Sequence, residues 1–124
     1  MSRRVMIIND DPALATLLRY NFEAEGCQVL HVDCGAAATS LLANDIPDLI
    51  VMDWSLPKIS GVEICRSLRR CIGLERLPII MLTTRSSASD REFAFKIGVN
   101  EFFTKPFSLS DLLARSRRLL DAVP

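Results

Sequence analysis

The stretch DLIVMDWSLPKISG, from Asp48 to Gly61, sets an apolar run directly before a carboxylate and then breaks into proline and glycine. Residues 49–52 have the length and continuity of a strand that is buried on both faces. Asp53 follows at the tip of this run, and the proline and glycine beyond it indicate a loop. A charged group at the end of a buried strand needs partners. Asp53 therefore either caps a turn or takes part in chemistry.

Apolar runs of strand length recur along the chain, and stretches with helical spacing of apolar residues separate them. The runs lie at 5–8, 29–32, 49–52 and 79–82 and, less regularly, at 101–104. Strands that alternate with helices predict a parallel sheet with helices on both faces. We therefore predict an α/β, doubly wound domain, and the chain shows no repeat or linker that would divide residues 1–124.

Turn and capping residues predict where the helices begin and end. Asp11-Pro12 and Ser108 are expected to start the first and fifth helices, whereas Gly26, Asn44, Gly73 and Gly98 are expected to stop the first four. The third helix is expected to present an apolar stripe of Ile64, Cys65, Leu68 and Ile72.

Composition narrows the class of protein. The 124 residues fit one domain, with 49% hydrophobic and 24% charged residues. Lys+Arg and Asp+Glu balance at 15 each, which argues against direct contact of this domain with nucleic acid or an anionic membrane. Neither a secretory leader nor a membrane-spanning run is expected, so the predicted location is cytoplasmic. The four cysteines form no C-x-x-C pair and are expected to be reduced, with a disulfide or zinc site as the alternative.

Polar residues with chemical potential follow four of the predicted strands. They are Asn9, Asp10 and Asp11 after the first, Asp53 and Ser55 after the third, Thr83 at the end of the fourth, and Lys105 after the fifth. Ligands of parallel sheets bind outside the carboxyl ends of the strands, so these side chains should lie near one another. Carboxylates and carbonyls suit Mg²⁺. A carboxylate beside such a cation can attack phosphorus, and a lysine and a hydroxyl can then hold the phosphoryl oxygens.

Each of these residues also has a plainer interpretation. Asp11 fits an N-cap, Asp10 and Asp53 fit turn carboxylates, Thr83 fits a strand-end hydroxyl, and Lys105 fits a solvated loop residue. Their joint placement at one edge of the sheet favours a functional site over coincidence.

Four segments resemble the receiver domains of bacterial two-component response regulators, and the likeness extends from about Arg4 to Leu120. The segments read VMIINDDP, PDLIVMDWSLPKISGVEICRSLR, LPIIMLTTR and FFTKPFS. The motifs DWSLP and TKPFS are most similar to the phosphate-regulon branch of the OmpR/PhoB class. The resemblance implies a flavodoxin-like (βα)5 fold with strand order 2-1-3-4-5 and a single receiver domain, which fits both the N-terminal part of a longer DNA-binding regulator and a stand-alone receiver.

The resemblance also implies a phosphorylation-activated switch. Asp53 would accept a phosphoryl group from a sensor histidine kinase, and the protein would catalyse only its own phosphorylation and dephosphorylation. The remaining implied roles are Mg²⁺ binding by Asp10, Asp53 and the Ser55 backbone carbonyl, with Asn9 and Asp11 acting through water; phosphoryl binding by Thr83 and Lys105; switching by Thr83 and Phe102; and control of rates by Ser55 and Arg85. The Lys105–Pro106 peptide would be cis.

The implied output is transcription regulation through a homodimer built on the fourth helix, fifth strand and fifth helix. Across that interface Arg91 would pair with Asp111, and Glu101 with Arg115.

Three features depart from the family pattern. Asn9 stands where a second acid is expected, which predicts weaker Mg²⁺ binding. Phe102 stands where tyrosine is common and lacks its hydroxyl. The segment TTRSSASD lacks an acidic run. These departures motivate the alternative of a non-phosphorylated pseudo-receiver that acts as a protein-interaction module. A phosphatase of the haloacid dehalogenase type is disfavoured, because that chemistry favours an aspartate where Ser55 stands.

Overall fold

The computed structural model describes residues 2–122, in which five strands and five helices alternate. Their bounds are β1 (Arg4–Ile8), α1 (Pro12–Ala24), β2 (Gln28–Val32), α2 (Gly35–Leu42), β3 (Leu49–Asp53), α3 (Gly61–Arg69), β4 (Ile79–Thr83), α4 (Ala88–Ile97), β5 (Glu101–Thr104) and α5 (Leu109–Asp121). All strand pairs are parallel, in the order β2-β1-β3-β4-β5. The predicted doubly wound α/β fold and its strand order are confirmed.

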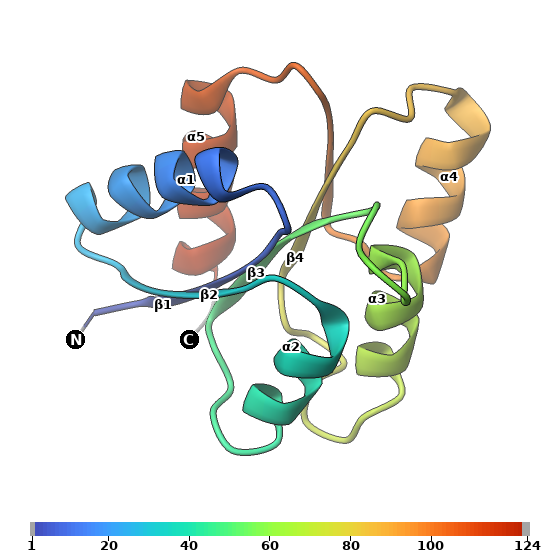
Figure 1. Ribbon diagram of the computed structural model, residues 1–124, viewed down its shortest axis with the longest axis horizontal. Helices are drawn as coiled ribbons and strands as arrows, with labels where there is room; N and C mark the ends of the chain where they lie inside the picture. Colours follow the sequence, from blue (N-terminus) through green and yellow to red (C-terminus); the bar gives the residue numbers. More distant parts are fainter. Residues whose placement is uncertain (1, 123–124) are drawn as a thin grey trace.

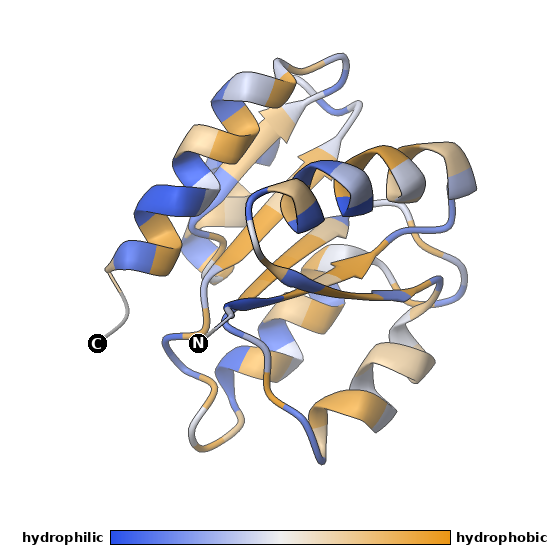
Figure 2. Cartoon of the chain, turned by 90° about the vertical axis from the view of Figure 1, so that its left-hand side faces the viewer, coloured by the Kyte–Doolittle hydropathy of each residue, from blue (hydrophilic) through white to orange (hydrophobic). Residues whose placement is uncertain are grey.

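Helices cover both faces of the sheet: α1 and α5 lie on one side, and α2, α3 and α4 lie on the other (Figure 1). Alternate residues of each strand supply the two cores. In β1, Val5 and Ile7 pack with α1 and α5, whereas Met6 and Ile8 pack toward α2 and α3. Figure 2 shows the hydrophobic colouring concentrated on the strands and on the inner faces of the helices.

The central strands β3 and β4 are buried along their whole length, which explains their unbroken apolar runs. Met52 lies level with Ile8, and Thr83 lies level with Thr104, so the carboxyl ends of these strands share one edge. Among residues 2–122, no helix is long and apolar enough to cross a membrane.

The helix caps agree with the sequence at most positions. The Asp11 side chain accepts hydrogen bonds from the Ala13 and Leu14 N–H groups, and Ser108 accepts from the Asp111 N–H. Both predicted N-caps are therefore confirmed.

The predicted end of the third helix is wrong. Helix α3 stops at Arg69, and Ile72 is fully exposed rather than part of the apolar stripe. The N–H groups of Arg70 and Cys71 bond to carbonyls three residues earlier, which tightens the chain into a turn before Gly73 adopts a φ of 90°. Helical spacing alone placed Ile72 with Leu68, but the chain has already left the helix there.

Arg69 fastens the end of α3 to the end of α4. Its guanidinium donates to the Gly98 carbonyl from Nε at 3.1 Å and from Nη2 at 2.7 Å, and to the Leu74 carbonyl at 3.0 Å. Nη2 also donates to Asn100 Oδ1 at 3.0 Å. Carbonyl groups at the C-terminal end of a helix lack partners within the helix. The Arg69 guanidinium supplies donors to carbonyls in the loops that follow α3 and α4.

We predict that Arg69→Ala lowers the free energy of unfolding by about 2–3 kcal/mol, because hydrogen bonds from a charged donor are individually worth about 1.5–3 kcal/mol. Urea unfolding measures this loss. Arg70→Ala removes an exposed neighbour and should stay within about 0.5 kcal/mol of wild type. Equal losses in the two variants would contradict the fastening role of Arg69.

Candidate functional site

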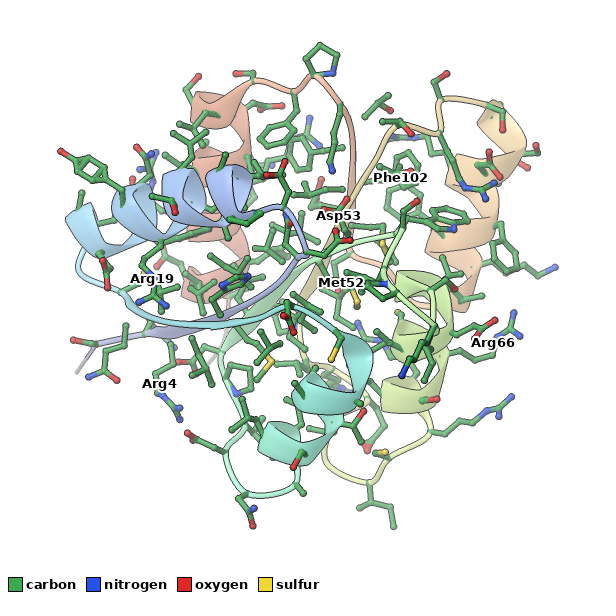
Figure 3. All side chains as sticks on the ribbon, viewed as in Figure 1. Arg4, Arg19, Met52, Asp53, Arg66 and Phe102 are labelled. Carbon is green, nitrogen blue, oxygen red and sulfur yellow. The ribbon has the colours of Figure 1, made fainter. Side chains whose placement is uncertain are left out.

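Asp53 lies at the tip of β3, and only 3% of the residue's surface is exposed. Lys105 Nζ is 2.6 Å from Asp53 Oδ1, and the Lys105 N–H donates to the Thr83 carbonyl at 2.7 Å. The Lys105–Pro106 peptide is cis, as the family resemblance implied. Figure 3 shows Asp53 at the centre of the molecule, with Arg4 at the far end of the sheet.

Burial raises the pKa of the Asp53 carboxyl group, and the charges of Asp10 and Asp11 act in the same direction. Lys105 lowers this pKa through its hydrogen bond and its charge, but burial outweighs it. The ionised carboxylate is thus under-compensated in the folded protein. A carboxylate in such surroundings favours an additional cation.

Gly61 allows the loop after Asp53 to close on the strand. The Gly61 N–H donates to the Trp54 carbonyl at 2.7 Å, and a Cβ atom on Gly61 would overlap the Asp53 carbonyl oxygen. Ser60 then caps α3 by accepting from the Glu63 N–H. Ser55, two residues after Asp53 in this loop, is exposed.

Thr83 brings a buried hydroxyl to the same edge. It is 2% exposed, and its Oγ1 accepts from the Arg85 N–H at 2.9 Å. The Arg85 guanidinium lies 4.8 Å from the ring centre of Trp54 and 3.7 Å from Asp90 Oδ1. Arg85 therefore links Thr83 to Trp54: its backbone N–H bonds to the Thr83 hydroxyl, and its side chain lies over the Trp54 ring.

Phe102 is buried between the site and α4 (Figure 3). Its ring meets Trp54 edge-on at 6.3 Å and Phe95 at 6.5 Å between ring centres. The guanidinium of Arg91 lies 5.8 Å from the Phe102 ring and 5.0 Å from the Phe95 ring. These contacts were not predicted from the sequence, although Phe95, an aromatic residue in a polar helix, was a signal for them.

The residues after β1 differ in their surroundings. Asp10 is exposed, Asp11 is occupied as the cap of α1, and Asn9 is 1% exposed with its Oδ1 accepting from the Asp11 N–H at 2.6 Å. Within residues 2–122, no group of three or more His, Cys, Asp and Glu side chains is arranged to hold a metal ion. The predicted Mg²⁺ donor set instead comprises two carboxylates and a backbone carbonyl.

The residues expected at a dimer interface have partners within the chain. Arg115 pairs with Glu101 at 2.6 Å and with Asp111 at 3.4 Å, while Arg91 contacts the aromatic rings of Phe95 and Phe102. Any pairing of these residues across a two-fold axis would require them to exchange these contacts.

A parallel sheet with a buried carboxylate facing a lysine at one edge defines a doubly wound α/β domain with a polar site at the carboxyl ends of its strands. Residues 5–117 match the response regulator receiver domain, so the chain belongs to that family. It is 43% identical over 120 residues to the phosphate regulon transcriptional regulatory protein PhoB of Rhizobium meliloti, covering 97% of this chain and 53% of the relative. It is 34% identical over 122 residues to the alkaline phosphatase synthesis transcriptional regulatory protein PhoP of Bacillus subtilis, covering 97% and 49%.

A solved structure gives the same fold. The receiver domain of a sensor histidine kinase from Pseudomonas aeruginosa has a TM-score of 0.87 and 27% identity, covering 98% of this chain and 100% of that one. That structure is described with a magnesium ion coordinated in its active site cleft. The chain spans about half the length of the curated relatives it matches, 53% and 49%.

We predict that Gly61→Ala destabilises the protein by about 1–3 kcal/mol, the range for overpacking, and displaces Asp53 and Trp54. Urea unfolding and Trp54 fluorescence measure the two effects. Gly73→Ala is the control, since Gly73 has positive φ but no atom within 4 Å of a Cβ. Gly73→Ala should lower the free energy of unfolding through backbone strain but leave Trp54 emission unchanged. Unchanged emission in Gly61→Ala would contradict the predicted displacement.

We predict that Asp53→Asn raises the free energy of unfolding at neutral pH, by on the order of 1 kcal/mol. The pKa of Asp53 is raised in the folded state, so its ionised form costs stability above that pKa. This cost disappears as the pH falls and wild-type Asp53 protonates, so the two proteins should converge. Urea unfolding without divalent cations across a pH series tests this, with exposed Asp33→Asn as control. A less stable Asp53→Asn protein at neutral pH would mean that Lys105 outweighs burial.

Proposed function

We propose that the protein is a phosphorylation-activated switch in which Asp53 accepts a phosphoryl group from the phosphohistidine of a sensor histidine kinase. A carboxylate oxygen of Asp53 bonds to phosphorus while the phosphorus–nitrogen bond breaks, and the imidazole leaves with that electron pair. The observation that carries this proposal is the buried Asp53 carboxylate, 2.6 Å from Lys105. Lys105 would then contact the transferred phosphoryl oxygens.

The residues present fit Mg²⁺ as the cofactor. Asp10, Asp53 and the Ser55 carbonyl supply hard oxygen ligands, and Asn9 and Asp11 would act through water. When bound, Mg²⁺ neutralises negative charge that would otherwise repel a phosphoryl donor. The raised pKa of Asp53 supports a need for such neutralisation. The magnesium described in the Pseudomonas relative supports the same assignment.

Thr83 and Phe102 would convert phosphorylation into a change of surface. The Thr83 hydroxyl accepts from the Arg85 N–H in the structure, and we propose that it turns to the phosphoryl group. Arg85, which lies on Trp54, would then shift and so affect the rate of phosphoryl loss, as would Ser55. The buried ring of Phe102 would respond by packing, since it has no hydroxyl to donate.

The proposed output is a homodimer through α4, β5 and α5, with Arg91 paired to Asp111 and Glu101 to Arg115 across the interface. Exposed ion pairs contribute only about 0–1 kcal/mol each, so their exchange is a small energetic step. Because the curated relatives are named as transcriptional regulators, we propose a cytoplasmic transcription regulator with a DNA-binding part outside this chain. This domain would not itself contact nucleic acid or a membrane.

A second candidate is a pseudo-receiver that binds partners without phosphorylation. Two observations favour it: Asn9 occupies the place of an acid, and Phe102 is already buried against Trp54. A phosphatase of the haloacid dehalogenase type has less support, because Ser55 cannot serve as its general acid.

The two candidates differ in the mass of the protein after incubation with acetyl phosphate and Mg²⁺. We predict that wild type gains one phosphoryl group and Asp53→Ala gains none, because among residues 2–122 Asp53 is the one acid that combines burial with a lysine partner. Light scattering of the same samples should show dimers only in phosphorylated wild type. No adduct at any Mg²⁺ concentration would favour the pseudo-receiver.

A further inference from the structure

Asn9 has one polar group that the fold leaves unsatisfied. Its N–H donates to the Val32 carbonyl at 3.0 Å, its carbonyl accepts from His31 Nε2 at 2.8 Å, and its side-chain Oδ1 accepts from the Asp11 N–H at 2.6 Å. The side-chain Nδ2 has no partner, and within residues 2–122 it is the one buried side-chain nitrogen or oxygen in that condition. Buried polar groups are almost always paired, so this donor calls for an acceptor.

The orientation of the Asn9 amide is fixed. The backbone N–H of Asp11 can only donate, so the Asn9 atom that faces it must be the oxygen. The NH₂ group therefore points away from Asp11. Because the side chain is 1% exposed, bulk water does not serve as its acceptor.

Asn9 is a neighbour of Asp53 on the sheet. Ile8 lies level with Met52 in the parallel β1–β3 ladder, which places the next residues, Asn9 and Asp53, level with each other. Adjacent strands are about 4.8 Å apart, and side chains alternate between faces. Ile7 and Val51 point into the same core, so the residues two positions later, Asn9 and Asp53, share that face.

The acceptor that best fits this donor is an anion on Asp53. Among residues 2–122, Lys105 is the one hydrogen-bonding partner of the Asp53 side chain, and it occupies Oδ1. A phosphoryl group on Asp53 brings three strong acceptor oxygens. A water held by a metal fits this NH₂ group less well, because its oxygen faces the metal; such a water donates its hydrogens, so its partner on Asn9 would be Oδ1.

We infer that the Asn9 side-chain amide donates a hydrogen bond to the phosphoryl group formed on Asp53, and so joins Lys105 in binding it. This inference rests on the proposed function. An acid at residue 9 would add a negative charge for Mg²⁺ to neutralise, whereas Asn9 adds a donor and no charge. Formation of phospho-Asp53 is accordingly less dependent on Mg²⁺ than it would be with an acid there.

Two substitutions at residue 9 separate the donor from the charge. Asn9→Ser keeps an oxygen that can accept from the Asp11 N–H and keeps the charge at zero, but it removes the amide. Asn9→Asp keeps that acceptor, removes the amide and adds a charge. Urea unfolding checks that both variants fold. Asp53→Ala, which offers no phosphoryl acceptor, is the third protein.

The first readout is the ¹H–¹⁵N spectrum of side-chain amides, in which the Asn9 signal is identified by its loss in Asn9→Ser. Phosphorylation by acetyl phosphate should move this signal downfield in wild type and leave it unmoved in Asp53→Ala. The second readout is intact mass against Mg²⁺ concentration. At a low Mg²⁺ concentration that limits the reaction, wild type should gain the phosphoryl group about tenfold faster than Asn9→Ser, as loss of a charge-assisted hydrogen bond implies.

Asn9→Asp should lower the half-saturating Mg²⁺ concentration about tenfold, because a second carboxylate near the metal strengthens its binding. At saturating Mg²⁺ it should react more slowly than wild type, because it lacks the amide donor. A fully phosphorylated wild type whose Asn9 signal does not move would overturn this inference and leave the proposed function standing. Equal rates for wild type and Asn9→Ser at every Mg²⁺ concentration at which wild type reacts would do the same. No uptake by wild type at any Mg²⁺ concentration would overturn both.

Discussion

The candidate site is built around a buried carboxylate that its surroundings only partly neutralise. Asp53 ends a central strand with 3% of its surface exposed, and Lys105 is its one cationic partner within residues 2–122. Burial raises the pKa of Asp53 despite that partner. The buried strands β3 and β4 fix its position, and Gly61 allows the following loop to lie against its backbone. A rigid framework thus holds a reactive group in an unfavourable environment, a common arrangement at functional sites.

Contacts lead from this carboxylate to the surface of α4. Trp54, the residue after Asp53, is covered by Arg85 and meets Phe102, and Phe102 in turn lies near Arg91. The backbone of Arg85 is bonded to the hydroxyl of Thr83. A change in what Thr83 binds would therefore alter the packing under α4, since packed side chains shift between discrete arrangements. This path ends on Arg91, which the proposed dimer would also use.

Patterns along the chain were sufficient to predict the fold and the residues at the sheet edge. Buried strands such as β3 have continuous apolar runs, and parallel strands bring Asp53, Thr83 and Lys105 to one edge. The end of α3 was mispredicted because Ile72 has helical spacing although the chain has already turned. Contacts such as Arg69 to Gly98 were not predictable, because they depend on how two helices lie relative to each other. The unpaired amide of Asn9 likewise emerges only from its three-dimensional surroundings.

The proposed switch depends on whether Asp53 is the residue that carries the phosphoryl group. Borohydride reduction converts a phosphorylated aspartate to homoserine, and peptide mass spectrometry then locates the modified residue. After treatment with a small phosphoryl donor and Mg²⁺, the proposed switch should yield homoserine at position 53 and unmodified aspartate at Asp10 and Asp11. Modification at Asp10 or Asp11, or none in a folded protein with Mg²⁺ bound, would contradict it.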